Sequence, residues 1–205
     1  VLTVGLPANL TAWTGVDALT HAIEAYIVPD FHPLCDGAAI EALKLINKYL
    51  VTSVEEPENL EARGGMLVGS CLAGISFLKG LGFVHAISHM VGAEFDTQHG
   101  LTNAIVLPVV LRYNLPSLDE KRRQMADALN INDKTTDGFV GDIEATLNRL
   151  DIPKSLSSIG VPLDCASRVA EKAMFDSAAS TNPVKGNSKD IKALIERSIL
   201  DARRL

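Results

Sequence analysis

The sequence has little of what several large protein classes require. Its 205 residues include only three cysteines, Cys35, Cys71 and Cys165, and none of them forms a C-x-x-C pair. Neither a disulfide framework nor a thiolate zinc site is therefore indicated, and we expect a cytoplasmic location. Basic residues are in the minority, with 19 Lys and Arg against 25 Asp and Glu, so the net charge is -6. Because nucleic acids and anionic membranes bind basic surfaces, we expect small molecules as partners instead.

Long hydrophobic runs are missing as well. The longest apolar run, residues 104–111, contains Pro108, and it is far shorter than the roughly 20 residues that a membrane-spanning helix needs. We therefore expect no transmembrane helix. The N-terminus, VLTVGLPANLTAWTG, has no initiator Met, no basic region and no small-residue cleavage site. It does not resemble a signal peptide, and we expect that it is a truncation point.

Helical periodicity is what the chain does contain. Hydrophobic residues make up 47% of the sequence, and they recur at the three- and four-residue spacing of helices rather than the alternation of half-buried strands. We predict an all-α fold in which residues 1–205 form a single helical domain. Thr14 and Asp17 have the spacing of a capping box, which predicts the start of the first helix at Thr14. Helices are predicted at residues 14–28, 35–50, 58–78, 82–93, 101–113, 118–129, 137–150, 163–174 and 188–204.

Four of the five histidines fall in segments that could face one another. Asp17 and His21 are four residues apart and share one face of the first predicted helix, as His85 and His89 do on a later one. His99 follows in a polar turn, where a side chain can point back at the preceding helix. One carboxylate and three imidazoles are ligands that suit Fe²⁺ or Zn²⁺. The fourth histidine would be left as a proton carrier.

A single histidine in an apolar helix is more often a hydrogen-bonded core residue than a ligand. His-x-x-x-His alone is also a weak signal, and HAISH lacks the glutamate that a zincin protease requires. The grouping of four histidines with an aspartate favours the metal site over this simpler interpretation. His32, in a loop, is not part of the predicted group. Glu24 lies one turn beyond His21, and we expect it to hydrogen-bond a ligand or to form a structural salt bridge.

Two long stretches carry Asp17 and the four grouped histidines: TGVDALTHAIEAY, residues 14–26, and GFVHAISHMVGAEFDTQHGLTNAIVLP, residues 82–108. They resemble the two signatures of a known family, the iron-dependent (group III) alcohol dehydrogenases. The entry GLPANLTA and the late loop at residues 181–183 extend the resemblance over nearly the whole chain. The resemblance implies that His89 is not a ligand but lies near the nicotinamide and takes part in a proton relay. It implies four metal ligands: Asp17, His21, His85 and His99.

The same resemblance implies an enzyme that interconverts an alcohol with an aldehyde or ketone, using NAD(P) and Fe²⁺, with Zn²⁺ as the alternative metal. We expect a homodimer when the protein is full length. Family members pair an N-terminal α/β dinucleotide-binding domain with a C-terminal helical domain of the dehydroquinate synthase-like fold, and this chain resembles only the second. It has no G-x-G-x-x-G or Gly-Gly-Gly-Ser motif. We therefore expect the isolated chain to bind metal and to be inactive, or nearly so.

Three alternatives remain open from the sequence. Glycerol dehydrogenases and dehydroquinate synthases are zinc enzymes of the same superfamily with three ligand residues, and the fourth ligand here favours the alcohol dehydrogenase branch over them. A non-catalytic metal-binding or assembly domain is compatible with the missing dinucleotide motif. A metal hydrolase would need a general-base carboxylate beside the metal, and Glu24 is the only candidate.

Overall fold

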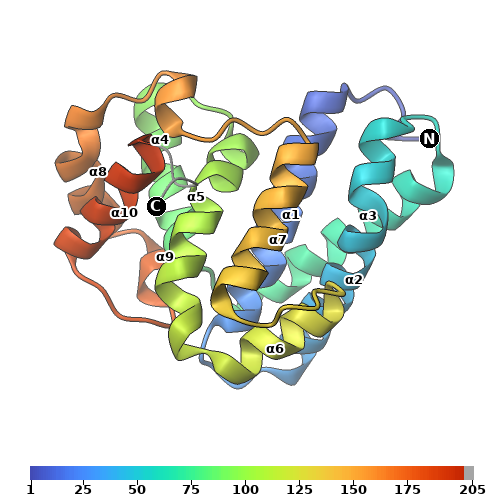
Figure 1. The fold of residues 1–205 in the computed structure, drawn as a ribbon, viewed down its shortest axis with the longest axis horizontal. Coiled ribbons are helices and arrows are strands. Elements are labelled where there is room, and N and C mark those ends of the chain that lie inside the picture. The colour runs from blue at the N-terminus through green and yellow to red at the C-terminus, as the bar shows by residue number, and fades with distance from the viewer. Residues whose placement is uncertain (201–205) are drawn as a thin grey trace.

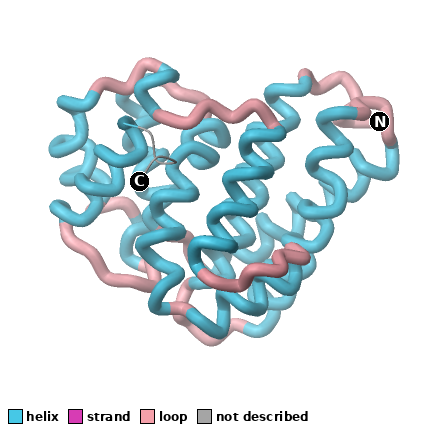
Figure 2. The backbone as a smooth tube through the Cα atoms, in the orientation of Figure 1, coloured by secondary structure: helices cyan, strands magenta, loops and turns pink. Residues whose placement is uncertain are grey.

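The computed structural model describes residues 1–200 and contains helices joined by loops, with no strand in that range (Figures 1 and 2). The all-α prediction is confirmed. The α-helices are α1 (Ala8–Ile27), α2 (Pro33–Glu55), α3 (Leu60–Ser76), α4 (Phe83–Phe95), α5 (His99–Asn114), α6 (Asp119–Ala128), α7 (Thr136–Arg149), α8 (Ala166–Ala173), α9 (Ser177–Ser180) and α10 (Ser188–Leu200). Short 3₁₀ turns are Phe77–Lys79, Leu115–Ser117, Leu156–Ile159 and Leu163–Cys165.

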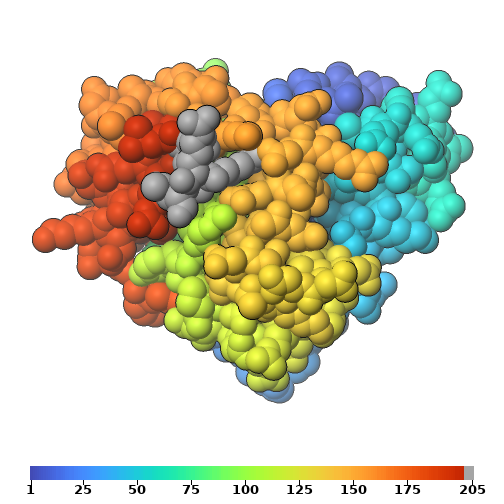
Figure 3. Space-filling view, viewed as in Figure 1, coloured from blue at the N-terminus to red at the C-terminus, as the bar shows by residue number. Residues whose placement is uncertain are grey.

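Helix α1 lies in the middle of the molecule. The pair α2 and α3 packs on one side of it, and α5 packs on the other (Figure 1). Helices α4 and α10 pack against α5, α8 packs against α4 and α10, and α9 packs against α4, so α8 and α10 lie together at one end of the molecule (Figures 1 and 3). Because both halves contact α1, most of this helix is buried, and residues on it can be reached from α4 and α5.

The predicted start of the first helix was wrong. Helix α1 begins at Ala8, after Pro7 at the N-cap position, and Thr14 lies in its interior. The hydroxyl of Thr14 donates to the carbonyl of Leu10 at 2.8 Å, the bond that threonine makes one turn back inside a helix. Residues 8–13 continue the helix upstream, so no cap is needed at Thr14. The carboxylate of Asp17 is therefore free of a capping role.

Other boundaries differ by a few residues, and two differences change the site. His99 is the first residue of α5 rather than part of the preceding turn. Helix α9 was not predicted at all, because four residues carry no periodicity. The segment predicted as one helix at residues 163–174 begins with a 3₁₀ turn before α8. The last predicted helix is described as far as Leu200, and its end at residue 204 lies outside the described residues.

The structure also describes the three cysteines and the length and hydropathy of the helices. Cys35, Cys71 and Cys165 are free thiols, and only Cys71 is exposed. Within residues 1–200, no single helix is long and apolar enough to cross a membrane. One pair, Leu60–Lys79 with Phe83–Phe95, reaches that length and composition only when joined across a bend of 102°.

Candidate metal centre

Three helices bring the site together. Asp17 and His21 lie in the middle of α1, His85 lies in the first turn of α4, and His99 is the first residue of α5. Gly100 allows α5 to reach α1, because a Cβ at this position would lie 2.4 Å from the carbonyl oxygen of Trp13 and 3.1 Å from Cβ of Asp17. The start of α5 is thereby held directly against the middle of α1.

The four predicted ligands lie together. Each offers one ligand atom, and these atoms all lie within 4.8 Å of one another. Oδ1 of Asp17 is 3.9 Å from Nε2 of His21, 3.7 Å from Nε2 of His85 and 3.4 Å from Nε2 of His99. In a tetrahedral site with bonds of about 2.1 Å, neighbouring ligand atoms are roughly 3.4 Å apart. One carboxylate oxygen and three imidazole nitrogens at this spacing fit a divalent metal ion.

Glu24 joins α1 to the start of α4. Its carboxylate is almost fully buried, and it accepts hydrogen bonds from the backbone N–H groups of Gly82 (3.0 Å), Val84 (2.8 Å) and His85 (3.3 Å). These are first-turn donors that have no partner within their own helix. Asn182 accepts from the N–H of Phe83 at 3.1 Å and completes the set. A buried carboxylate at a helix N-terminus is also favoured by the helix dipole.

Glu24 also orients the His85 ring. Its Oε2 lies 2.7 Å from Nδ1 of His85, so Nδ1 carries a hydrogen and Nε2 faces Asp17. This arrangement, a carboxylate on one imidazole nitrogen with the other nitrogen in the site, is typical of metal-binding histidines. The sequence placed Glu24 beside Asp17 and His21 on α1, and the structure shows that its partner is His85 on another helix.

Asn103 is a polar residue of the site that the sequence reasoning missed. Its Nδ2 donates to Oδ1 of Asp17 at 2.7 Å and lies 3.1 Å and 3.0 Å from Nε2 of His85 and His99. Its Oδ1 is the buried side-chain polar atom that lacks a hydrogen-bond partner in residues 1–200. Asn103 is four residues after His99, so helical spacing could have indicated it. The amide nitrogen of Asn103, and not this oxygen, faces the ligand atoms of Asp17, His85 and His99.

Protonation within the cluster follows from burial and from the carboxylates. Burial lowers the pKa of His21 to about 4 and lowers that of His99, although Asp17 opposes both shifts. Burial also disfavours a charged His85, but hydrogen bonds with Asp17 and Glu24 outweigh it and raise the pKa to about 9. Burial would raise the pKa of Asp17, yet His85, His21 and the Asn103 amide together lower it. Neutral His21 and His99 beside an ionised Asp17 are in the states that metal ligation requires, whereas His85 would have to release its Nε2 proton on binding a metal.

His89 lies beside the four residues rather than among them. Its ring stacks on His99, with centroids 5.4 Å apart and 16° between the planes, and its side chain is 39% exposed. Nδ1 of His89 lies 2.9 Å from Oδ2 of Asp176. Asp176 was missed, and no sequence pattern could have linked residues 87 positions apart. His32 lies elsewhere, exposed, and its Nδ1 accepts a hydrogen bond from the N–H of Cys35 at the start of α2.

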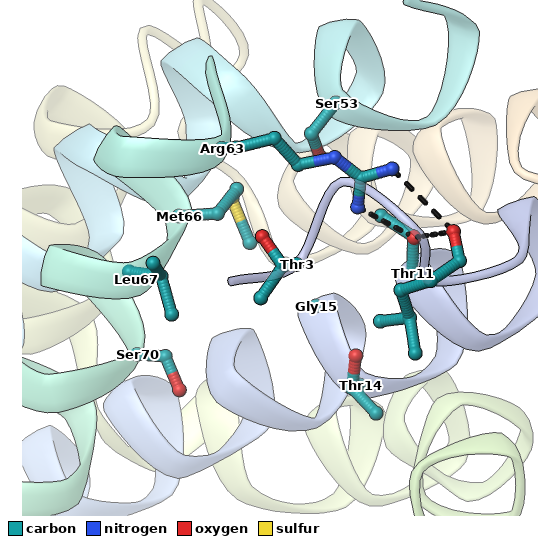
Figure 4. A pocket seen from close by; sticks show the side chains of 10 residues that line it. Thr3, Thr11, Thr14, Gly15, Ser53, Arg63, Met66, Leu67 and Ser70 are labelled. Atoms are coloured by element: carbon teal, nitrogen blue, oxygen red, sulfur yellow. Dashed lines mark hydrogen bonds between the residues drawn. The ribbon is translucent and has the colours of Figure 1, made fainter. Parts of the chain in front are cut away.

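A separate cavity of about 110 Å³ lies between the N-terminal loop, α1 and α3, and none of the four residues lines it (Figure 4). The buried side chain of Arg63 crosses its edge and donates to Oγ1 of Thr11 at 2.8 Å and, more weakly, to the carbonyl of Leu6 at 3.5 Å. A third bond from Nε reaches the carbonyl of Pro57. Arg63 therefore fastens two loops to α1 and α3.

A protein-family model matches most of the chain. The family model described as "Fe-containing alcohol dehydrogenase family, C-terminal" matches residues 11–199. The chain belongs to the Fe-containing alcohol dehydrogenase family. It is 41% identical over 205 residues to 1,3-propanediol dehydrogenase of Klebsiella pneumoniae, covering 97% of this chain and 53% of the relative. It is 36% identical over 205 residues to NAD-dependent methanol dehydrogenase of Bacillus methanolicus, covering 97% and 54%.

Solved structures of Fe-containing alcohol dehydrogenases and related enzymes share the fold. A 1,3-propanediol oxidoreductase has a TM-score of 0.91 and 40% identity, covering 96% of this chain and 53% of that one. An alcohol dehydrogenase from Oenococcus oeni has a TM-score of 0.89 and 34% identity, covering 96% and 53%. The chain thus spans about half the length of these family members.

Proposed function

We propose that this chain is the metal-binding catalytic part of an NAD(P)-dependent alcohol dehydrogenase, which interconverts an alcohol and an aldehyde or ketone by hydride transfer. The observation that carries the proposal is the convergence of one carboxylate and three imidazoles, from three helices, within 4.8 Å. Membership of the family supports the reaction class, since relatives are named as propanediol and methanol dehydrogenases.

We propose Fe²⁺ as the metal and Zn²⁺ as the alternative, because both accept nitrogen and oxygen ligands. When bound, the ion supplies a Lewis acid next to the substrate oxygen, while NAD(P) supplies the hydride acceptor or donor. One carboxylate with three neutral rings leaves such an ion with net positive charge, which this chemistry needs. The proposed ligands are Asp17, His21, His85 and His99.

Neighbouring side chains keep the ligand atoms in place. Glu24 fixes the first turn of α4 and holds Nε2 of His85 toward Asp17. Asn103 holds the carboxylate of Asp17 from α5. Val84, Ala86 and Ile87, which flank His85 in α4, are apolar and fully buried.

His89 is the proposed proton carrier. Its ring contacts His99 on one side and remains 39% exposed, so it touches both the cluster and the surface. Imidazole accepts and releases protons near neutral pH. His89 can therefore take up the hydroxyl proton of an alcohol and pass it to solvent.

The proposed substrate is a small primary alcohol or the corresponding aldehyde. The names of the similar proteins refer to 1,3-propanediol, methanol and butanol, which share a primary hydroxyl on a short chain. We further propose that residues 1–205 act as one helical domain. Because the sequence holds no glycine-rich dinucleotide motif, we expect these 205 residues alone to bind metal without dehydrogenase activity.

Metal analysis of purified variants tests the site. The wild-type chain is expected to hold one divalent ion per molecule after reconstitution with Fe²⁺ or Zn²⁺ and desalting, measured by plasma mass spectrometry. Asp17→Ala and His99→Ala should each lower metal retention by about 10-fold or more. His32→Ala, which removes an exposed histidine outside the cluster, should retain the wild-type amount. Equal retention in all four proteins would show that the proposed ligands are wrong.

Activity is tested separately with the enzyme expressed from its complete reading frame. Alcohol-dependent reduction of NAD⁺ or NADP⁺ by the metal-loaded enzyme supports the dehydrogenase. Metal binding by these residues without such activity on any short alcohol would instead favour a non-catalytic metal-binding domain.

A further inference from the structure

A carboxylate from the C-terminal part of the chain holds the His89 ring. Oδ2 of Asp176 lies 2.9 Å from Nδ1 of His89, and its Oδ1 accepts a hydrogen bond from the N–H of Ala178 at 2.8 Å. The side chain of Asp176 is 12% exposed, so its carboxylate is largely shielded from water. One carboxylate oxygen is thus fixed by the backbone and the other is presented to the imidazole.

The segment that carries Asp176 is tied along α4 independently of this pair. Oγ1 of Thr181 donates to the carbonyl of Leu81 at 2.7 Å, and Oδ1 of Asn182 accepts from the N–H of Phe83 at 3.1 Å. The segment therefore runs antiparallel to α4, with Asp176 near its middle and Thr181 beside its start. Its bonds to the start of α4 set the position of Asp176, so the carboxylate is available to orient His89.

The contact determines which nitrogen of His89 carries hydrogen. An ionised carboxylate only accepts hydrogen bonds, so Nδ1 is the protonated nitrogen and the lone pair of the neutral ring is on Nε2. Among residues 1–200, Nε2 of His89 has no hydrogen-bond partner. Stacking on His99 at 5.4 Å restricts rotation of the ring. Nε2 is therefore held in one orientation with its acceptor site open.

We propose that Asp176 is a positioning residue for the reaction, which holds His89 in the tautomer and orientation that leave Nε2 free to accept the hydroxyl proton of the alcohol. The proton forms a bond to Nε2 as the O–H bond breaks, and the imidazolium then returns it to solvent. This inference rests on the proposed function, because it deepens the role given to His89.

Asp176→Asn separates this role from the structural role of the residue. The amide oxygen can still accept from the N–H of Ala178, so the start of α9 keeps its cap. The NH₂ group takes the place of Oδ2 and can only donate, so it favours a hydrogen on Nε2 of His89 instead of Nδ1. Asp190→Asn is the matched control, since Asp190 caps the start of α10 through a 2.8 Å bond from the N–H of Asn187.

The first readout is nuclear magnetic resonance of ¹⁵N-histidine-labelled, metal-free chain at about pH 8.5, where an ordinary imidazole is neutral. Wild type and Asp190→Asn should show His89 with hydrogen on Nδ1. Asp176→Asn should shift the population to the Nε2–H form. An Nε2–H ring in wild type, or an unchanged tautomer in Asp176→Asn, would overturn the proposal without any bearing on the dehydrogenase activity.

The second readout is steady-state kinetics of the enzyme expressed from its complete reading frame. Asp176→Asn should lower kcat by about 10- to 100-fold, the usual cost of removing a partner that orients a site residue. The KM for alcohol should stay within about threefold of wild type, because no substrate contact is lost. Metal content should be unchanged, and Asp190→Asn should match wild type. A wild-type kcat in Asp176→Asn would refute the positioning role, whereas an inactive wild-type enzyme would refute the proposed function instead.

Discussion

Glu24→Gln tests whether one buried carboxylate holds the start of α4. The amide oxygen can keep the 2.8 Å bond from the N–H of Val84. The NH₂ group would replace Oε2, which now accepts from the N–H of Gly82 and from the N–H and Nδ1 of His85. Three hydrogen-bond donors would then face another donor, the NH₂ group of the glutamine. This position is almost fully buried, with Glu24 1% exposed.

The expected loss of stability is large. Each hydrogen bond to a charged group contributes about 1.5–3 kcal/mol, and buried groups left without partners add to the loss. The two shorter bonds to Oε2, from the N–H of Gly82 at 3.0 Å and from Nδ1 of His85 at 2.7 Å, give about 3 kcal/mol at the lower limit. For a domain of this size, 1 kcal/mol shifts Tm by about 2–4 °C, so a decrease of about 6–12 °C is expected.

Thermal unfolding of the chelator-treated chain, followed by circular dichroism, measures this shift. Glu144→Gln is the control, because it removes a carboxylate whose bonded partner is a single side chain, Arg112 at 2.8 Å. That change should cost about 1 kcal/mol or less. If Glu24→Gln melted within about 2 °C of wild type, Glu24 would not be what holds the first turn of α4.

Two further predictions concern other parts of the fold. Gly100→Ala should push α5 away from α1, because the new Cβ would lie 2.4 Å from the carbonyl oxygen of Trp13, and metal titration should show weaker binding. Gly64→Ala is the control, because a Cβ there has nothing within 4 Å. It should bind metal normally, and its free energy of unfolding should rise by about 0.5–1 kcal/mol. For Lys121, burial and the nearby Lys79 lower the pKa from 10.5 to about 8. Between these pH values the unfolded chain binds more protons, so the free energy of unfolding of wild type should rise with pH relative to Lys121→Met. Urea unfolding of both proteins from pH 8 to 10 measures the difference, and parallel curves would contradict the reasoning.

The pairing of Asp17 with His21 and of His85 with His89 could be predicted because their spacing is local. Asp17 and His21 are four residues apart, so they lie on the same face of α1 wherever that helix begins. His85 and His89 lie on the same face of α4 for the same reason. The wrong helix start at Thr14 did no harm to this prediction, because the error changed the length of α1 and left its periodicity intact. Short-range periodicity is therefore enough to group candidate ligand residues before any tertiary contact is known.

Helical spacing could not decide which histidine of α4 enters the cluster. His85 and His89 lie on the same face, one turn apart, yet His85 is buried and His89 is 39% exposed. The difference follows from Glu24, which binds the first turn of α4 and draws His85 against α1. Family resemblance supplied the assignment at the level of sequence, and the bond from Glu24 gives a physical reason for it.

The groups that orient the histidines come from distant segments, so the sequence indicated Glu24 without its partner His85 and missed Asp176 altogether. Glu24 reaches His85 across 61 residues, and Asp176 reaches His89 across 87. Asp176 stands before a helix of four residues that has no periodic signal, and its neighbours Thr181 and Asn182 bind the start of α4. Asp176→Asn should therefore alter how His89 is held while leaving metal binding unchanged, because no hydrogen bond or ion pair joins Asp176 to the four proposed ligands within residues 1–200.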